Sequence, residues 1–139
     1  MTKFERKRRL AIIPAREGSK RLAKKNLRTL AGKPLIEYTL ECSSQCEKIT
    51  DIVCTSDSNE ILQYGSEYFS RIAPQATTYS VRLPGCLTQD DSLLTPVVRY
   101  CLDRLDEIAT DTKFDTVILL QPTSPFRSQA DLSSAIDLH

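Results

Sequence analysis

Three uninterrupted apolar runs divide the chain into repeating units. They are LAIIPA at 10–15, ITDIVCTS at 49–56 and TVILLQ at 116–121. Short continuous runs rich in Ile, Val and Leu are typical of strands that are buried on both faces of a parallel sheet. We therefore predict three buried parallel strands in these segments, with 116–121 as the clearest of them.

Helical periodicity fills the spaces between these runs. Pro34 suits the first position of a helix, and apolar or small residues recur at helical spacing from there to position 43. A second helix is predicted from about Ser58 through Phe69, with Asp57 or Ser58 as its N-cap. This order of strand, helix, strand and helix is the βαβ pattern of an α/β protein.

The second half of the chain continues the pattern after an irregular stretch. Residues 71–91 have no sustained period and are predicted as loop, with at most one short strand near 77–81. A third helix is predicted to start between Ser92 and Pro96 and to end near Ile108, and Ser128 is expected to cap a fourth that continues toward His139. The expected fold is a mostly parallel α/β sheet with helices on both faces.

Composition narrows the class of protein. The 139 residues are 40% hydrophobic and 27% charged, in the range of a single globular domain, and no apolar run approaches the roughly 20 residues that span a bilayer. The N-terminus lacks the apolar core and cleavage site of a signal peptide, which predicts a cytoplasmic protein without a membrane partner. Five scattered cysteines and a single histidine favour reduced thiols over a zinc site or a disulfide framework.

Charge is divided unevenly along the chain. Residues 1–28 hold 11 basic and 2 acidic residues, a balance of +9, whereas the other 111 residues hold 8 basic and 16 acidic residues, a balance of −8. An acidic remainder disfavours a nucleic-acid coat, so we predict no nucleic-acid partner, although an N-terminal nucleic-acid arm stays an alternative. We expect 1–9 to be a disordered basic tail and 10–139 to be the folded domain.

Three polar loops follow the predicted strands: REGSKRLAKKN, SDSNE and QPTSPFR. In an open parallel sheet, ligands bind outside the carboxyl ends of the strands, so these loops are expected to share a crevice. In the first loop Gly18 allows close backbone approach, Ser19 is a small donor, and Lys20 and Lys25 supply charge, as a phosphate site requires. The loop is neither a P-loop nor a GxGxxG turn, and a solvated basic surface is the alternative.

The motifs together resemble a known family. IIPAREGSKRLAKKN, then GKPL, TSD, and LLQPTSPFR occur in the order and spacing of the CMP-sialic acid synthetases, the acylneuraminate cytidylyltransferases. The resemblance covers nearly all of the chain from Leu10 and implies a Rossmann-like nucleotidyltransferase sheet. It also implies the transfer of CMP from CTP to a nine-carbon 2-keto sugar acid, with release of pyrophosphate.

The same resemblance implies roles for individual residues. Arg16 and Lys25 would act in catalysis. The residues implied to bind the sugar acid are Gln121, Thr123 and Ser124. The alternative for these three is a purely structural role, in a rigid turn that leads to a Ser128 cap. The alternative for Arg16 is a salt bridge, and Asp57 is expected to cap a helix and not to act in catalysis. The residues implied to bind the nucleotide are Arg16, Ser19, Lys20, Lys25, Asn26, Arg82 and Ser92.

Two departures from the family pattern matter. Leu83 stands where the family has an arginine before the proline that aligns with Pro84, so Arg82 is the expected substitute. Family members are longer, and the aspartates that hold their Mg²⁺ lie in a part that has no counterpart here. The chain is therefore expected to be a truncated member with no metal ligands of its own, whose full-length relatives would form homodimers.

Two functions follow as alternatives. One is a cytidylyltransferase, or the nucleotide-binding part of one, acting on CTP and a sugar acid. The other is a catalytically inactive CTP-binding fragment or interaction module. The motifs quoted above do not distinguish N-acetylneuraminate, legionaminate and pseudaminate as the acceptor.

Overall fold

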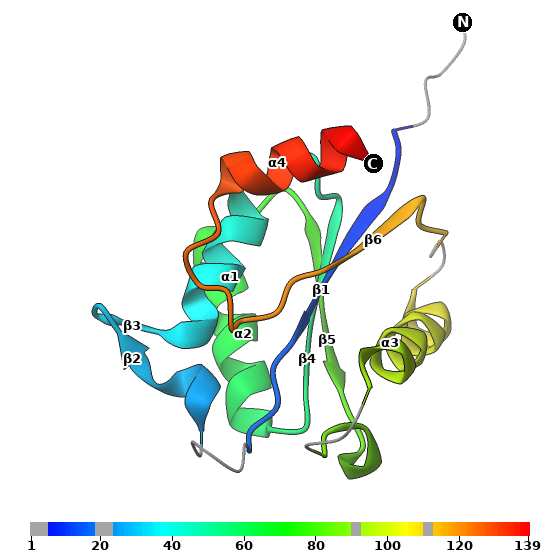
Figure 1. Cartoon of the computed structure of the whole chain (residues 1–139). Helices are drawn as coiled ribbons and strands as arrows, with labels where there is room; N and C mark the ends of the chain where they lie inside the picture. The colour runs from blue at the N-terminus through cyan, green and yellow to red at the C-terminus, as the bar shows by residue number, and fades with distance from the viewer. Residues whose placement is uncertain (1–5, 19–23, 90–92, 110–112) are drawn as a thin grey trace, which may run out of the picture.

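A four-stranded parallel sheet forms the centre of the molecule (Figure 1). The computed structural model describes residues 6–18, 24–89, 93–109 and 113–139. The strands lie in the order β5-β4-β1-β6, and each neighbouring pair runs parallel. Their bounds are β1 Arg9–Pro14, β4 Asp51–Ser56, β5 Thr77–Arg82 and β6 Thr116–Leu119.

Helices cover both faces of this sheet, as predicted. Helices α1 (Leu35–Gln45), α2 (Asn59–Ile72) and α4 (Gln129–Leu138) lie on one face, and α3 (Leu94–Ile108) lies on the other (Figure 1). Successive side chains of a strand point to opposite faces. Accordingly, Ala11 and Ile13 of β1 belong to the core under the three helices, and Leu10 and Ile12 belong to the core under α3.

Short elements connect the loop that follows β1, called here the basic loop (residues 16–24), to α1. A single 3₁₀ turn, η1 (Lys25–Leu27), is followed by a small hairpin of β2 (Thr29–Leu30) and β3 (Lys33–Pro34). The two residues at its tip have positive φ, 51° at Ala31 and 89° at Gly32, which is the conformation of the tight turn that joins antiparallel strands. A second 3₁₀ turn, η2 (Gly85–Leu87), follows β5.

The predicted strands and helices are confirmed, with one error of burial and one at the start of α1. Pro34 is the N-cap of α1 and the last residue of β3, and not the first residue of the helix, which is Leu35. The short strand expected near 77–81 is β5, and the four predicted helices are present. The segment 116–121, however, contains the edge strand β6, where Val117 is 37% exposed, and not a strand buried on both sides. A run of apolar residues does not distinguish a central strand from an edge strand that is covered by a helix on only part of its surface.

The predicted disordered tail ends earlier than expected. Arg9 is the first residue of β1, and the Arg8 guanidinium lies 2.9 Å from the Asp51 carboxylate, so the expectation for 1–9 is wrong at these two positions. The pairing joins residues 43 positions apart. Residues 1–5 lie outside the described part of the chain.

The cysteines behave as small core residues. None forms a disulfide, and four of the five are buried, with Cys86 exposed. Burial raises the pKa of Cys54 to about 12 and raises that of Cys101, which keeps both thiols protonated at neutral pH. Within the described ranges, no helix has the length and the apolar character needed to cross a membrane.

Candidate functional site

A cavity of about 300 Å³ opens at the carboxyl ends of the strands. Its lining comes from the segments that follow β1, β5 and β6, together with η1 and the start of α3. This is the position that a parallel sheet predicts for a ligand. The lining residues nearest the strand ends are Pro14, Ala15, Leu83, Gln121 and Pro122.

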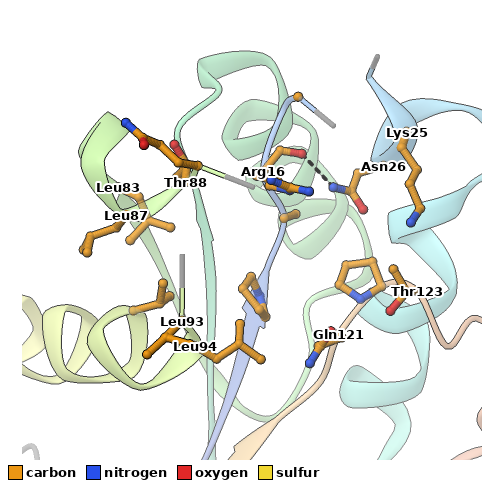
Figure 2. Close-up of a pocket in the computed structure, with 16 residues that line it drawn as sticks. Arg16, Lys25, Asn26, Leu83, Leu87, Thr88, Leu93, Leu94, Gln121 and Thr123 are labelled. Carbon is orange, nitrogen blue, oxygen red and sulfur yellow. Dashed lines mark hydrogen bonds between the residues drawn. The ribbon is translucent and has the colours of Figure 1, made fainter. Parts of the chain in front are cut away.

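One side of the cavity is polar. Arg16, Lys25 and Asn26 approach it from the basic loop and η1, and Gln121 and Thr123 approach it from the segment after β6 (Figure 2). The first group carries two positive charges, whereas the second offers only an amide and a hydroxyl. The polar side therefore has a cationic part and a neutral part.

The opposite side is apolar. Leu83, Leu87, Leu93 and Leu94 gather there, away from the cations (Figure 2). Leu83 is 4% exposed and packs in the core under α3, whereas Leu93 is 73% exposed. Thr88 and Gln89 lie beside these leucines and add polar groups to this wall.

The basic loop is held by hydrogen bonds at its base. The buried side chain of Asn26 donates from Nδ2 to the carbonyl oxygen of Arg16 at 2.8 Å (Figure 2). The Lys24 N–H donates to the carbonyl oxygen of Glu17 at 3.0 Å and closes the loop between them. These bonds hold the backbone of Arg16 and Glu17 in place.

Asp57 does not cap α2. Ser58 does, because its Oγ accepts a hydrogen bond from the Ile61 N–H. The Asp57 Oδ1 instead accepts a hydrogen bond from the Glu17 N–H at 2.9 Å. Of the two predicted caps, Ser58 is confirmed and Asp57 is wrong.

The segment after β6 is a rigid turn that leads into α4. The carbonyl oxygen of Gln121 accepts hydrogen bonds from the Ser124 N–H at 3.2 Å and from the Arg127 guanidinium at 3.0 Å. Ser128 then forms a capping box with Asp131, as expected for a helix start. The turn leaves Thr123 on the cavity but not Ser124.

Comparison with known proteins decides the family. The family model described as "Cytidylyltransferase" matches residues 10–139. The chain belongs to the cytidylyltransferase family. The resemblance seen in the motifs is thereby confirmed.

Two curated relatives illustrate the similarity. The chain is 40% identical over 132 residues to the CMP-N,N'-diacetyllegionaminic acid synthase of Legionella pneumophila, covering 94% of this chain and 52% of the relative. It is 36% identical over 130 residues to the N-acylneuraminate cytidylyltransferase of Escherichia coli, covering 94% of this chain and 28% of the relative. The matched region thus spans about half of the first relative and about a quarter of the second.

The fold of this cytidylyltransferase chain also matches solved structures. One is the structure of CMP:2-keto-3-deoxy-manno-octonic acid synthetase complexed with CTP, with a TM-score of 0.62 and 24% identity. The match covers 94% of this chain and 46% of that one. It supports the Rossmann-like nucleotidyltransferase fold.

The cavity includes six of the residues expected from the sequence. They are Arg16, Gly18, Lys25, Asn26, Gln121 and Thr123. Ser19, Lys20 and Ser92 lie outside the described residues.

Arg82 is the exception among the predicted nucleotide ligands. Its guanidinium donates to Asn59 Oδ1 at 3.0 Å, and it does not line the cavity. The next residue, Leu83, does line it, because consecutive residues at the end of β5 point in opposite directions. Arg82 therefore does not replace the family arginine at position 83, and the wall at this point is apolar.

The described lining does not fit a resident Mg²⁺. Mg²⁺ prefers oxygen ligands that include carboxylates, and none of the described residues on the cavity carries one. Over the ranges that the structure describes, no group of three or more His, Cys, Asp or Glu side chains could hold a metal ion. The expected Mg²⁺ dependence stays a prediction, and we assign no step to the ion.

Sequence reasoning missed the apolar wall. Leu87, Leu93 and Leu94 lie in or next to the stretch read as irregular, and their side chains meet only after the chain folds. The sequence signal that could have indicated this wall is the leucines of LPGCLTQ, together with Leu93 and Leu94 at the start of α3. Such leucines are usually assigned to the core.

Proposed function

We propose that the cavity binds CTP and that this chain is the nucleotide-binding part of a cytidylyltransferase that acts on a nine-carbon 2-keto sugar acid. The observation that carries the proposal is the division of the polar side of the cavity into a cationic part, Arg16 with Lys25, and a neutral part, Gln121 with Thr123. The first part suits a triphosphate. The second suits a ligand with many hydroxyl groups.

The cations would act on the phosphates. In the reaction, the oxygen of the anomeric hydroxyl of the sugar acid forms a bond to the α-phosphorus of CTP and the hydroxyl proton is released to solvent. The bond from the α-phosphorus to the oxygen that bridges to the β-phosphorus breaks, and pyrophosphate leaves with that oxygen. Negative charge accumulates on the phosphate oxygens as the bond breaks, and fixed positive charges next to them lower the barrier. Arg16 and Lys25 are the groups that we assign to this task.

The neutral groups would hold the acceptor. Gln121 offers both a donor and an acceptor through its amide, and Thr123 adds a hydroxyl, so together they can match a polyhydroxylated sugar without favouring one charge. The relatives named for legionaminic acid and for N-acylneuraminate support the class of acceptor. We place the acceptor among the nine-carbon sugar acids as a class.

Calorimetric titration with CTP tests the binding step. Replacing Lys25 with Ala should weaken binding about ten-fold or more, since a charge-assisted contact contributes about 1.5 to 3 kcal/mol. Lys24→Ala is the matched control, because Lys24 is its exposed neighbour, does not line the cavity and lies 3.6 Å from Glu60. Equal CTP affinity in the Lys25→Ala variant and the wild type would remove Lys25 from the site.

A CTP-binding module without turnover is the second candidate. It is favoured by the absence of carboxylates from the described lining, since nucleotidyl transfer commonly needs an anchored metal ion. Pyrophosphate release from CTP, measured with Mg²⁺ and a panel of nine-carbon sugar acids, separates the two candidates. Because the chain spans only about half of one curated relative and less of the other, we expect no measurable release from the 139 residues alone. Turnover near one per second, a typical enzyme rate, would contradict that expectation.

A further inference from the structure

The peptide group between Arg16 and Glu17 is bonded at both of its polar atoms. Its carbonyl oxygen accepts a hydrogen bond from Asn26 Nδ2 at 2.8 Å, and its N–H donates to Asp57 Oδ1 at 2.9 Å. Asn26 belongs to η1, whereas Asp57 follows β4. A peptide group is planar and rigid, so this plane cannot rotate without breaking one of the two bonds.

The Asp57 carboxylate extends the hydrogen-bond ladder between β1 and β4. The Ala15 N–H donates to the carbonyl oxygen of Thr55 at 2.9 Å, which continues the regular parallel pattern beyond the last residue of β1. Two residues later, the Glu17 N–H meets the side-chain oxygen of Asp57. A hydrogen bond to an ionised carboxylate is stronger than one between neutral groups.

We infer that Asp57 is a positioning residue for the CTP site, an inference that rests on the function proposed above. Asp57 does not line the cavity, whereas Arg16 and Gly18, on either side of the residue that it holds, do. By fixing the Glu17 N–H, the carboxylate sets the direction in which the chain leaves β1. That direction places the Arg16 side chain and the Gly18 backbone at the cavity.

Asp57 acts by accepting a hydrogen bond from the Glu17 N–H, and its negative charge does not itself attract the ligand. A carboxylate close to a triphosphate site repels the ligand, so the charge by itself lowers CTP affinity. An asparagine at this position keeps an oxygen that can accept from the Glu17 N–H and loses the charge. Asp57→Asn should therefore preserve the geometry, and Asp57→Ala should release it.

Calorimetric titration of three variants with CTP tests this inference. Asp57→Ala should weaken CTP binding about ten-fold, because Arg16 and the Gly18 backbone are no longer held in place at the cavity. Asp57→Asn should stay within about two-fold of the wild type or bind more tightly. Asn59→Ala is the control, because it removes a polar side chain two positions further along the chain that does not line the cavity. The Asn59 Oδ1 accepts a hydrogen bond from the Arg82 guanidinium at 3.0 Å. The CTP affinity of this variant should not change.

Hydrogen exchange at the Glu17 amide gives a readout that is independent of CTP. The amide should be protected in the wild type and in Asp57→Asn, and it should exchange at least about ten-fold faster in Asp57→Ala. A thermal melt of each variant shows whether it is folded. If the wild type does not bind CTP at all, the proposed function fails, and the exchange rate alone then decides whether Asp57 holds the peptide.

Three results would overturn the inference. An equal loss of CTP affinity in Asp57→Asn and Asp57→Ala would mean that the carboxylate charge acts directly, for example on a cation. An unchanged affinity in Asp57→Ala would mean that the loop keeps its direction without the bond. Fast exchange of the Glu17 amide in the wild type would mean that the bond is absent in solution.

Discussion

The two ends of the parallel sheet contain the same kinds of charged residue but use them differently. At the amino ends of the strands, Asp51 is 2% exposed and accepts hydrogen bonds from Arg8, Thr50 and Tyr79. At the carboxyl ends, Arg16 and Lys25 line a cavity with no carboxylate among its described residues. The charged groups at the first end are buried against one another, whereas Arg16 and Lys25 at the second end line a space where a ligand can bind.

The amino end thereby joins all four strands. The Arg8 guanidinium lies 2.9 Å from Asp51 of β4 and 4.8 Å from the centre of the Phe114 ring, which precedes β6. The Arg8 N–H donates to Asp115 at 2.8 Å, and Tyr79 of β5 donates to Asp51 at 3.3 Å. The groups that stabilise the fold and the groups that can bind a ligand therefore lie at opposite ends of the strands, so substitutions at one end should leave the other unaffected.

The largest expected effect is at the amino end. Asp51→Ala should lower the free energy of unfolding by about 3 kcal/mol, because it leaves Arg8 without its buried partner and removes the acceptor of Tyr79 and Thr50. Urea unfolding measures the loss, and Glu107→Ala, which breaks an exposed pair with Arg104, is the control with an expected change below about 0.5 kcal/mol. A similar small change in both variants would show that the Asp51 network does not stabilise the sheet.

A smaller effect is expected at the carboxyl end. Arg16→Lys should weaken CTP binding about three- to ten-fold, because a point charge cannot reproduce the two-pronged contact of a guanidinium with phosphate. The free energy of unfolding should change by less than about 0.5 kcal/mol. Arg28→Lys, an exposed position of the same basic segment that does not line the cavity, is the matched control. A loss of stability without a loss of affinity would reverse the assignment of the two ends.

The smallest effect depends on pH. Burial, with the nearby charge of Asp51 and the hydrogen bond to it, raises the pKa of Tyr79 above its ordinary value of 10.0. The folded protein therefore holds this proton more tightly than the unfolded chain does, and the associated stability is complete below pH 10 and is lost as pH rises through the raised pKa.

Comparison with Tyr79→Phe isolates this contribution. The wild type should lose stability more steeply than the variant above pH 10, measured by urea unfolding in a pH series. Parallel pH profiles for the two proteins would show that Tyr79 has the same pKa in the folded and unfolded states.

The strands and helices could be predicted because their signals are local. The alternation of Leu10, Ala11, Ile12 and Ile13 between the two cores needs only a strand with helices on both faces, and the Ser128 cap depends on residues within one turn. Those features depend on neighbours in sequence. The edge of the sheet that binds a ligand was predicted from the general rule that ligands bind outside the carboxyl ends of parallel strands.

The errors concern contacts between distant segments. The pairing of Arg8 with Asp51 cannot be predicted from the residues next to either of them in the sequence. The edge position of β6 depends on the order of the strands in the sheet. Asp57 and Ser58 are both good caps by composition, and only the position of Glu17 shows which one caps the helix. In the same way, the direction of Arg82 depends on where β5 ends.

Mapping the CTP site by NMR tests the separation of the two ends most directly. Backbone amide shifts of the ¹⁵N-labelled 139-residue chain are followed during titration with CTP. We expect concentration-dependent shifts at Gly18, Lys25 and Thr123, and no shifts at Asp51 or Tyr79. Shifts centred on the amino end, or none anywhere at millimolar CTP, would contradict the claim that the cationic cavity is a nucleotide site.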